Sequence, residues 1–354
     1  MSIGRVALVG AGPGDPGLLT VRAVELIREA DVVAYDELVS ESILALVPAS
    51  AELLAVGRRA GDGPRAHAIH PDVLERARRG LRVVRLKAGD PLVFGRGGEE
   101  ALDLARAGIP FEIVPGISAA LGAASSAAIP LTHRDRSAQV VLSTGHRADG
   151  GAPPPDAPGG RTLVLYMAAN ELGANLDALV AAGWAGATPA ALVVAATTAD
   201  ERVVDGTLAT LAARVTSALG AAPKLPAVVL VGEAVGLREA IDWRARLPLY
   251  AKRVVVARGV DSNAALVCAL RTLGGDVVEL PLPGVDPGAP LVAPARWPLR
   301  VDLVVLPSPE GARALYDRAP PHVREAPAVA GETIEALLDA AVRATTAPDE
   351  GERG

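Results

Sequence analysis

Short apolar runs with strand character alternate with helical patterns over the first third of the chain, and this alternation limits the folds available to it. The strand candidates are residues 6–10, 32–35, 53–57, 83–86 and 111–114, and helical patterns between them cover 18–30, 40–47, 71–79 and 99–107. Strands separated by helices form parallel βαβ units. The sequence therefore predicts an α/β fold with mostly parallel sheets.

Breaks in this alternation divide the 354 residues into several units. A first α/β lobe is predicted over 1–138 and a second over 139–245, with strand candidates at 162–167, 190–195 and 227–232. A third α/β domain is predicted over 250–342, because a fresh strand pattern begins at 252–258. The polar tail, 343–354, is predicted to be disordered.

Charge and hydropathy exclude some classes of partner. The net charge is −6 and the pI is near 5.5, which argues against a nucleic-acid surface. The longest apolar runs fall short of the roughly 18 residues of a membrane span. The first residues enter a strand pattern without a charged leader and an apolar segment, so a cytoplasmic location is expected.

The few metal-binding residue types predict no metal site. A single cysteine, Cys268, excludes a disulfide framework, and its apolar helical surroundings predict that it is buried. His67, His70 and His133 are irregularly spaced, which is not typical of a zinc site.

The segment Val83–Glu100, VVRLKAGDPLVFGRGGEE, is the densest in potential chemistry. A strand is followed by one turn at Ala88-Gly89-Asp90-Pro91 and a second at 95–98. Small residues allow a ligand to approach the backbone closely, and proline fixes the exit of a turn. This combination predicts a ligand site.

A glycine-rich loop, GAGPGDPG, follows the first strand and leaves two interpretations open. Gly12, Gly14 and Gly17 satisfy G-x-G-x-x-G, which is typical of nicotinamide or flavin binding. Pro13 and Pro16 count against that interpretation, because Pro16 removes a backbone N–H that a pyrophosphate would need. The other interpretation is a connection that binds no ligand.

Several longer motifs resemble those of the tetrapyrrole methylases. They are the two Gly-Asp-Pro loops together with YDELVS (35–40), PGISAALGAASSAAIPLTHRD (115–135) and LVLYMA (163–168), and the likeness covers about residues 3–245. The resemblance implies a two-lobed homodimer that binds S-adenosylmethionine between its lobes. It further implies methylation of uroporphyrinogen III at two pyrrole carbons, which gives precorrin-2 for siroheme or cobalamin.

The resemblance also implies which residues line the cofactor pocket. At the matching positions these are Pro13, Ala88, Gly89, Asp90, Val93, Ser118, Ala119, Met167, Ala196 and Ala227. A sulfonium cofactor requires backbone donors and acceptors with small or apolar walls, and these positions supply them. Val194, Ala195 and Ala196 replace the polar and glycine residues that are usual there, which is a departure from the family pattern at the second lobe's cofactor contacts.

Guanidinium groups suit a macrocycle that carries carboxylates, and Arg96 and Arg134 occupy matched loops. Arg58 stands where many members have a lysine, so we expect it to anchor a carboxylate rather than donate a proton. For the base that accepts the pyrrole proton, Glu99 is the first candidate and Asp36 the second. Their alternatives are a carboxylate at a helix N-terminus and a helix-capping residue, respectively.

The C-terminal third resembles the opening of uroporphyrinogen-III synthases, at 247–281, 301–316 and 330–338. Such synthases have two lobes, whereas about 105 residues suffice for only one. The sequence therefore predicts a docking or stabilising domain without synthase activity. Two further functions stay open: methylation of a later precorrin or another substrate such as diphthine, and a binding protein that has lost catalysis.

Overall fold

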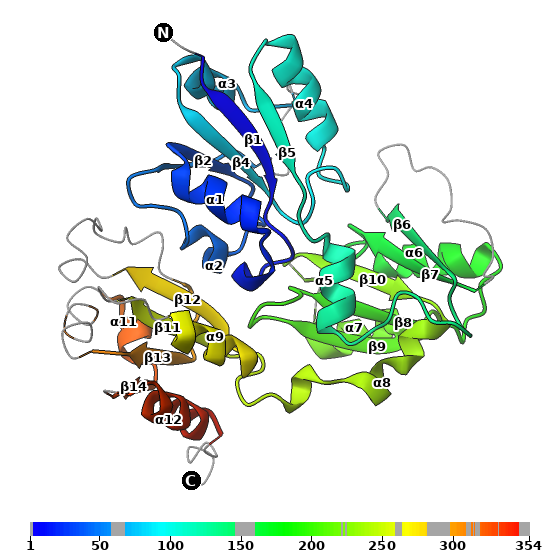
Figure 1. The fold of residues 1–354 in the computed structure, drawn as a ribbon. Coiled ribbons are helices and arrows are strands. Elements are labelled where there is room, and N and C mark those ends of the chain that lie inside the picture. The colour runs from blue at the N-terminus through cyan, green and yellow to red at the C-terminus, as the bar shows by residue number, and fades with distance from the viewer. Residues whose placement is uncertain are drawn as a thin grey trace.

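The computed structural model describes residues 3–57, 68–145, 160–220, 222–223, 225–258, 264–281, 298–308, 313, 315, 319–331 and 333–346. Three β-sheets organise three α/β units (Figure 1). None of the helices in these ranges is long and apolar enough to cross a membrane.

The first lobe contains an all-parallel sheet of five strands in the order β3-β2-β4-β1-β5. The strands are β1 (Arg5–Gly10), β2 (Val32–Tyr35), β3 (Glu52–Ala55), β4 (Arg82–Lys87) and β5 (Phe111–Val114). The helices between them are α1 (Val21–Glu29), α2 (Glu41–Leu44), α3 (Pro71–Arg78) and α4 (Gly97–Arg106), with a 3-10 turn, η1 (Pro16–Leu18), before α1. The α/β fold with a parallel sheet, predicted from the alternation of strands and helices, is confirmed in this lobe.

Helices cover both faces of this sheet, and successive side chains of each strand point to opposite faces. Ala7 and Val9 of β1 pack with α1 and α2, whereas Val6 and Leu8 pack with α3 and α4. This two-sided burial explains why the strands are almost continuously apolar. It also leaves the strand ends as the places where polar chemistry can lie.

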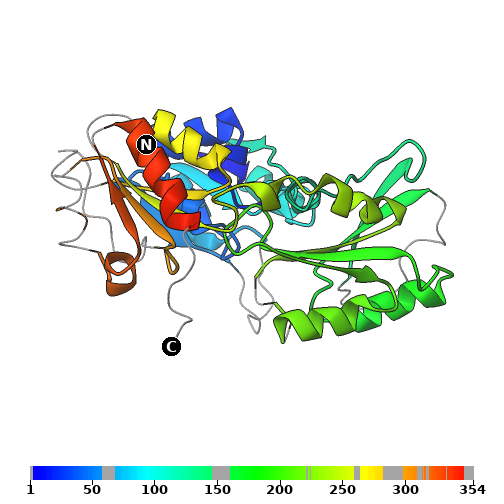
Figure 2. The same ribbon diagram turned by 90° about the horizontal axis from the view of Figure 1, so that it is seen from below.

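The second lobe follows helix α5 (Ala119–Ser126) and has a mixed sheet in the order β6-β7-β10-β8-β9. Its strands are β6 (Gln139–Thr144), β7 (Arg161–Tyr166), β8 (Pro189–Val194), β9 (Arg202–Thr207) and β10 (Ala227–Val231), with helices α6 (Leu172–Ala181) and α7 (Leu211–Leu219). Helix α5 covers one face and helices α6 and α7 the other (Figure 2). The sequence did not identify β6 and β9 as separate strands.

This second sheet departs from the parallel arrangement of the other two. Helix α6 makes a crossover that leaves β7 and β8 parallel, and β10 inserts between them, antiparallel to both. Strands β8 and β9 are joined without a helix and are also antiparallel. Only β6 and β7 pair in parallel.

The C-terminal unit is a parallel sheet in the order β12-β11-β13-β14. It contains β11 (Arg253–Arg258), β12 (Asp276–Pro281), β13 (Leu303–Leu306) and β14 (Ala328–Ala330), with α9 (Ala264–Thr272), α11 (Pro321–Arg324) and α12 (Ile334–Thr346). It is joined to the second lobe through η2 (Glu233–Leu237), α8 (Arg238–Ile241) and η3 (Arg244–Arg246).

Two sequence predictions for this unit were wrong. Cys268 is exposed, because Leu266, Val267 and Leu270 form the buried face of α9 and Cys268 lies outside that face. Helix α12 continues to Thr346, so the helix includes the first residues of the tail that was predicted to be disordered. The remainder of that tail, 347–354, lies outside the described residues.

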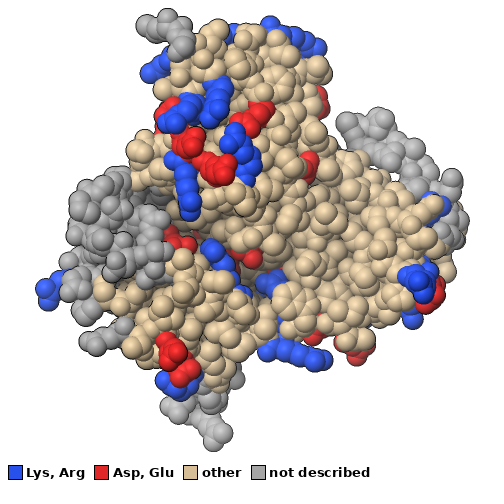
Figure 3. Space-filling view, in the orientation of Figure 1, with Lys and Arg blue, Asp and Glu red and all other residues tan. Residues whose placement is uncertain are grey.

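Charges of both signs lie side by side on the face of the molecule shown in Figure 3, most densely over the first lobe. Among the ion pairs of that lobe, Arg22 contacts Glu112 at 2.9 Å and Glu25 at 3.3 Å. Positive side chains on this face are therefore interspersed with negative ones.

Candidate functional site

Three loops meet where β1, β4 and β5 end. The amide of Gly12 donates to the carbonyl of Gly89 at 3.1 Å, and the amide of Gly89 donates to the carbonyl of Gly12 at 2.8 Å. A side chain at Gly116 would place its Cβ 2.3 Å from the Gly89 oxygen, and one at Gly10 would lie 2.5 Å from the Gly116 nitrogen. These glycines are required because the loop backbones touch one another.

Asp90 fixes the geometry of this junction. Its carboxylate accepts hydrogen bonds from the amide of Leu92 at 2.8 Å and from the amide of Gly116 at 3.1 Å. One side chain thus closes its own turn and ties that turn to the loop after β5. The predicted ligand loop is held rigidly at the carboxyl edge of the sheet, where open parallel sheets bind ligands.

A cavity of about 740 Å³ opens at this edge, with walls from both lobes. All ten positions that the resemblance assigned to the cofactor line it: Pro13, Ala88, Gly89, Asp90, Val93, Ser118, Ala119, Met167, Ala196 and Ala227. Most are small or apolar, and they come from segments far apart in the chain. The structure brings them together on one cavity surface.

Tyr166, at the end of β7, is a wall residue that sequence reasoning missed. Its hydroxyl lies 2.5 Å from the Ser118 hydroxyl and accepts a hydrogen bond from the amide of Ala120 at 3.1 Å. Its ring lies 4.7 Å from the ring of Phe94, between centroids. Tyr166 therefore links the second sheet to the start of α5 and to the loop after β4.

Four charged side chains form a second wall of the cavity: Asp36, Arg85, Lys87 and Glu100. Arg85 Nη2 lies 2.5 Å from Asp36 Oδ1 and 3.1 Å from Glu100 Oε1, and Lys87 Nζ lies 2.8 Å from Glu100 Oε1. The side chains of Arg85, Lys87 and Glu100 are at most 5% exposed. Buried charges persist only when they are paired in this way.

Of this charged wall, sequence reasoning identified only Asp36. Asp36 does not cap α2, because Ser40 is the N-cap and accepts from the amide of Ile43. Within the described residues, Glu100 Oε2 and Arg85 Nε make no hydrogen bond. Buried polar atoms of this kind call for an explanation, and a polar ligand is one.

The other predicted substrate and catalytic residues lie at varying distances from the cavity. Arg96 lines it and is hydrogen-bonded to Glu99 at 3.3 Å, and both side chains are more than half exposed. Glu99 is outside the lining, whereas its neighbour Glu100 is inside. Arg134 is exposed and also outside the lining, and Arg58 lies outside the described residues.

Candidate metal ligands do not gather in the described parts of the chain, where no group of three or more His, Cys, Asp or Glu side chains could hold an ion. His70 is the N-cap of α3 and accepts from the amide of Asp72, and His133 accepts from the amide of Asp135. His67 is among the residues that the structure does not describe.

Residues in the left-handed backbone region surround the cavity. Phe94, Arg96 and Met167 line it with φ angles of 54°, 57° and 55°. Ala195 and Thr197, at 46° and 70°, flank the lining residue Ala196. Such conformations are disfavoured for residues other than glycine, and they concentrate at functional sites.

Comparison with known proteins identifies the family of this chain. The family model of the Tetrapyrrole (Corrin/Porphyrin) Methylases matches residues 5–212, more than half of the chain. The chain belongs to the tetrapyrrole methylase family. The matched range of the methylase includes every residue of the cavity wall described above except Ala227.

Named relatives and solved structures resemble about two thirds of this chain. Siroheme synthase 1 of Yersinia enterocolitica is 47% identical over 253 residues, which are 69% of this chain and 52% of that protein. The uroporphyrin-III-C-methyltransferase of Thermus thermophilus is 40% identical, with a TM-score of 0.57, over 68% of this chain and 97% of that one.

A second crystal structure from Thermus thermophilus, of the uroporphyrin-III C-methyltransferase complexed with S-adenyl homocysteine, is 39% identical. It covers 66% of this chain and 100% of that one, with a TM-score of 0.55. The methylase spans about half the length of the curated relatives that it matches.

Proposed function

We propose that this chain is an S-adenosylmethionine-dependent methyltransferase that methylates uroporphyrinogen III at two pyrrole carbons and produces precorrin-2. One observation carries the proposal: the ten positions implied for the cofactor lie on one cavity between the lobes of a tetrapyrrole methylase. The Thermus thermophilus enzyme holding S-adenyl homocysteine supports the choice of methyl donor.

The residues of the cavity fit this cofactor. Pockets for ligands of this size have volumes of about 300–1,000 Å³ and mainly apolar walls, and the cavity of about 740 Å³ falls in that range. Pro13, Ala119 and Ala227 provide small apolar surfaces, and the backbone around Gly89 and Ala196 provides donors and acceptors. The bound cofactor supplies the methyl group and the leaving group, so the protein mainly supplies alignment.

The rim of the cavity suits a carboxylate-bearing macrocycle. Arg96 at the exposed rim presents a guanidinium that pairs with carboxylates bidentately. Asp36 and Glu100 balance the charges of Arg85 and Lys87, so these four side chains give the wall polar groups without a net charge. Carboxylate contacts by Arg134 and Arg58 remain part of the proposal.

Position favours Asp36 over Glu99 as the base that accepts the pyrrole proton. The Asp36 carboxylate lines the cavity, whereas Glu99 lies outside its lining and is 53% exposed. A base must come within hydrogen-bond reach of the proton that it removes. The exposed pair of Glu99 with Arg96 is better suited to orienting the guanidinium at the rim.

The assay for this function follows label from S-adenosylmethionine into uroporphyrinogen III. The wild-type chain should transfer two methyl groups, and Asp36→Asn should reduce the rate by about 10²-fold or more, the usual contribution of a general base. Glu99→Gln, which keeps the shape of the side chain, provides the comparison. Binding of both small molecules without transfer of label would instead support a binding protein.

We also propose that the enzyme acts as a cytoplasmic homodimer. Edge strands β5 and β6 expose apolar side chains, with Phe111, Ile113, Val140 and Leu142 between 38% and 40% accessible. Natural proteins usually cover such edges, and a second copy of the chain could do so. Sedimentation equilibrium tests this, and a monomer at micromolar concentration would contradict it.

The C-terminal unit is proposed to lack synthase activity. Within the described residues it contains one four-stranded sheet, whereas the synthases that it resembles use two lobes. The full chain should not convert hydroxymethylbilane to uroporphyrinogen III, and turnover would refute this part of the proposal.

A further inference from the structure

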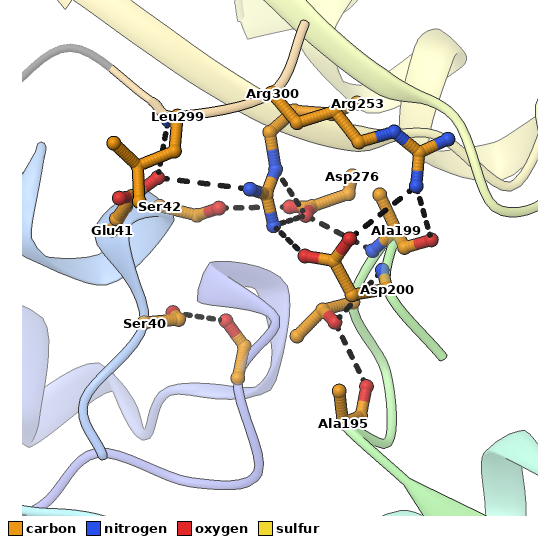
Figure 4. Close-up of polar contacts among 12 residues, drawn as sticks. Ser40, Glu41, Ser42, Ala195, Ala199, Asp200, Arg253, Asp276, Leu299 and Arg300 are labelled. Atoms are coloured by element: carbon orange, nitrogen blue, oxygen red, sulfur yellow. Dashed lines mark hydrogen bonds and ion pairs between the residues drawn. The ribbon is translucent and has the colours of Figure 1, made fainter. Parts of the chain in front are cut away.

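A buried ion pair joins the C-terminal unit to both lobes of the methylase (Figure 4). Arg253 begins β11 and Asp276 begins the neighbouring strand β12. Arg253 Nε and Nη2 donate to Asp276 Oδ2 at 3.0 and 2.9 Å. The two side chains are 8% and 3% exposed, so the pair lies inside the junction rather than on its rim.

Each lobe meets this pair through its own residues. Asp276 Oδ1 accepts from the hydroxyl of Ser42, on α2 of the first lobe, at 2.8 Å. Asp276 Oδ2 accepts from the amide of Ala199, in the second lobe, at 3.1 Å. Arg253 lies 3.3 Å from Asp200 and 3.6 Å from Glu41. One ion pair therefore contacts both lobes between which the cavity lies.

The second-lobe segment held here, Ala195–Glu201, has further contacts outside its own lobe. Arg300, just before β13, donates to the carbonyl of Ala199 at 3.4 Å and to Asp200 at 3.3 Å. The hydroxyl of Tyr250, just before β11, donates to Glu201 at 3.3 Å. The C-terminal unit thus holds the whole second half of this segment.

The first half of the same segment forms the cavity wall. Ala196 lines the cavity, and its neighbours Ala195 and Thr197 have φ angles of 46° and 70°. Residues with a Cβ adopt these angles only when their surroundings enforce them. The Thr197 hydroxyl also accepts from the amide of Asp15 at 3.1 Å, which connects the segment to the glycine loop that carries Pro13.

We infer that Arg253 and Asp276 are positioning residues, by which the C-terminal unit holds Ala195–Glu201 in the conformation that binds the cofactor. The inference rests on the proposed methyl-donor site. Neither side chain lines the cavity, so both act through the backbone of Ala199 and the side chain of Asp200. In this chain the synthase-like unit has a role in the methylation reaction itself.

The test measures binding of S-adenosylhomocysteine to the full chain by calorimetry and the steady-state constants for S-adenosylmethionine. Asp276→Asn removes the charge that holds the amide of Ala199 and should weaken binding about tenfold, as loss of one hydrogen bond to a charged group does. KM for S-adenosylmethionine should rise by a similar factor, while kcat at saturation changes less than about twofold, because no group at the reacting atoms is altered.

Asp200→Ala is the second variant, and it tests the positioning role if Asp276→Asn fails to fold. It removes contacts to Arg253 and Arg300 from a partly exposed position, and it should weaken binding in the same direction. The matched control is Asp205→Ala, which removes an aspartate from the same lobe that pairs with Arg238 and does not touch the C-terminal unit. Arg253→Lys keeps the charge and should retain part of the affinity.

Two results would overturn the inference, and they are distinguishable. Wild-type affinity in folded Asp200→Ala or Asp276→Asn would refute the positioning role and leave the proposed function intact. A wild-type chain that does not bind S-adenosylhomocysteine would refute both together.

Discussion

Lys87 Nζ lies 2.8 Å from Glu100 Oε1 in the cavity wall, and Arg85 Nη2 reaches the same oxygen at 3.1 Å. One buried carboxylate oxygen therefore contacts two cations, both of which lie at the end of β4, just before the ligand loop. Asp36 is the other anion that contacts both. The arrangement makes the wall sensitive to the loss of any single charge.

Glu100→Gln should lower the free energy of unfolding by about 3 kcal/mol, because it leaves two buried cations with one carboxylate. Glu99→Gln, one position earlier, should change it by less than about 0.5 kcal/mol, since that carboxylate is exposed. Urea denaturation measures both. Equal effects of the two variants would contradict the assignment of Glu100 as the buried member.

Gly116→Ala should destabilise the protein by about 2–3 kcal/mol and impair cofactor binding, because its Cβ would meet the Gly89 carbonyl at 2.3 Å. The matched control is Gly98→Ala, at the start of α4, where a Cβ has nothing within 4 Å. The control should be neutral or stabilising by up to about 1 kcal/mol, because alanine favours helices. If thermal melting shows that Gly116→Ala is tolerated as well as Gly98→Ala, the three-loop junction is not rigid.

The first lobe could be predicted from the sequence because its central strands, β1, β2 and β4, are almost entirely buried and every connection between its strands contains a helix. The second sheet could not be predicted in the same way. Nothing in the pattern of β10 indicates that it inserts between β7 and β8 and runs antiparallel to both. That order is set by how distant segments pack, not by local periodicity.

In the candidate site, the ten motif positions predicted for the cofactor all line the cavity, whereas Glu100, whose burial depends on helical phase, was not predicted. Gly97, Glu100, Asp103 and Leu104 form the buried face of α4, so a carboxylate occupies a position where an apolar residue is expected. Glu99 and Glu100 are adjacent in sequence, yet a helix turns by about 100° per residue. Glu99 therefore points to solvent, whereas Glu100 lies in the cavity wall. Tyr166 was missed because an aromatic residue at a strand end gives no signal for its hydroxyl contacts.

The pH dependence of stability should include a contribution from Asp31. Two hydrogen bonds from the Arg82 side chain and one from its backbone amide lower the pKa of Asp31 below its ordinary value of 3.8. A carboxyl whose pKa is lowered on folding stabilises the protein above the unfolded-state pKa, and that stabilisation is lost as the pH falls through the folded-state value. The difference in unfolding free energy between wild type and Asp31→Asn should therefore be largest at neutral pH and should decrease below about pH 4. A difference that stays constant down to about pH 2 would refute this.

The last prediction concerns the contact of Tyr166 with Ser118, which crosses from the second sheet to the first turn of α5. Tyr166→Phe leaves the Ser118 hydroxyl without its hydrogen-bond partner and the amide of Ala120 without its acceptor, and it should lower the free energy of unfolding by about 1–3 kcal/mol. Because Ser118 and Ala119 line the cavity, affinity for S-adenosylhomocysteine should fall as well.

A double-mutant cycle with Ser118→Ala separates the contact itself from the other effects of each substitution. The double variant should be less destabilised than the sum of the two single variants by about 0.5–2 kcal/mol. Either single substitution already removes the contact between the two hydroxyls, so the second substitution cannot remove it again. Strict additivity would mean that the two hydroxyls do not interact in solution. In that case the link between the second sheet and α5 would depend on the hydrogen bond from the amide of Ala120 and on the packing of α5 against that sheet.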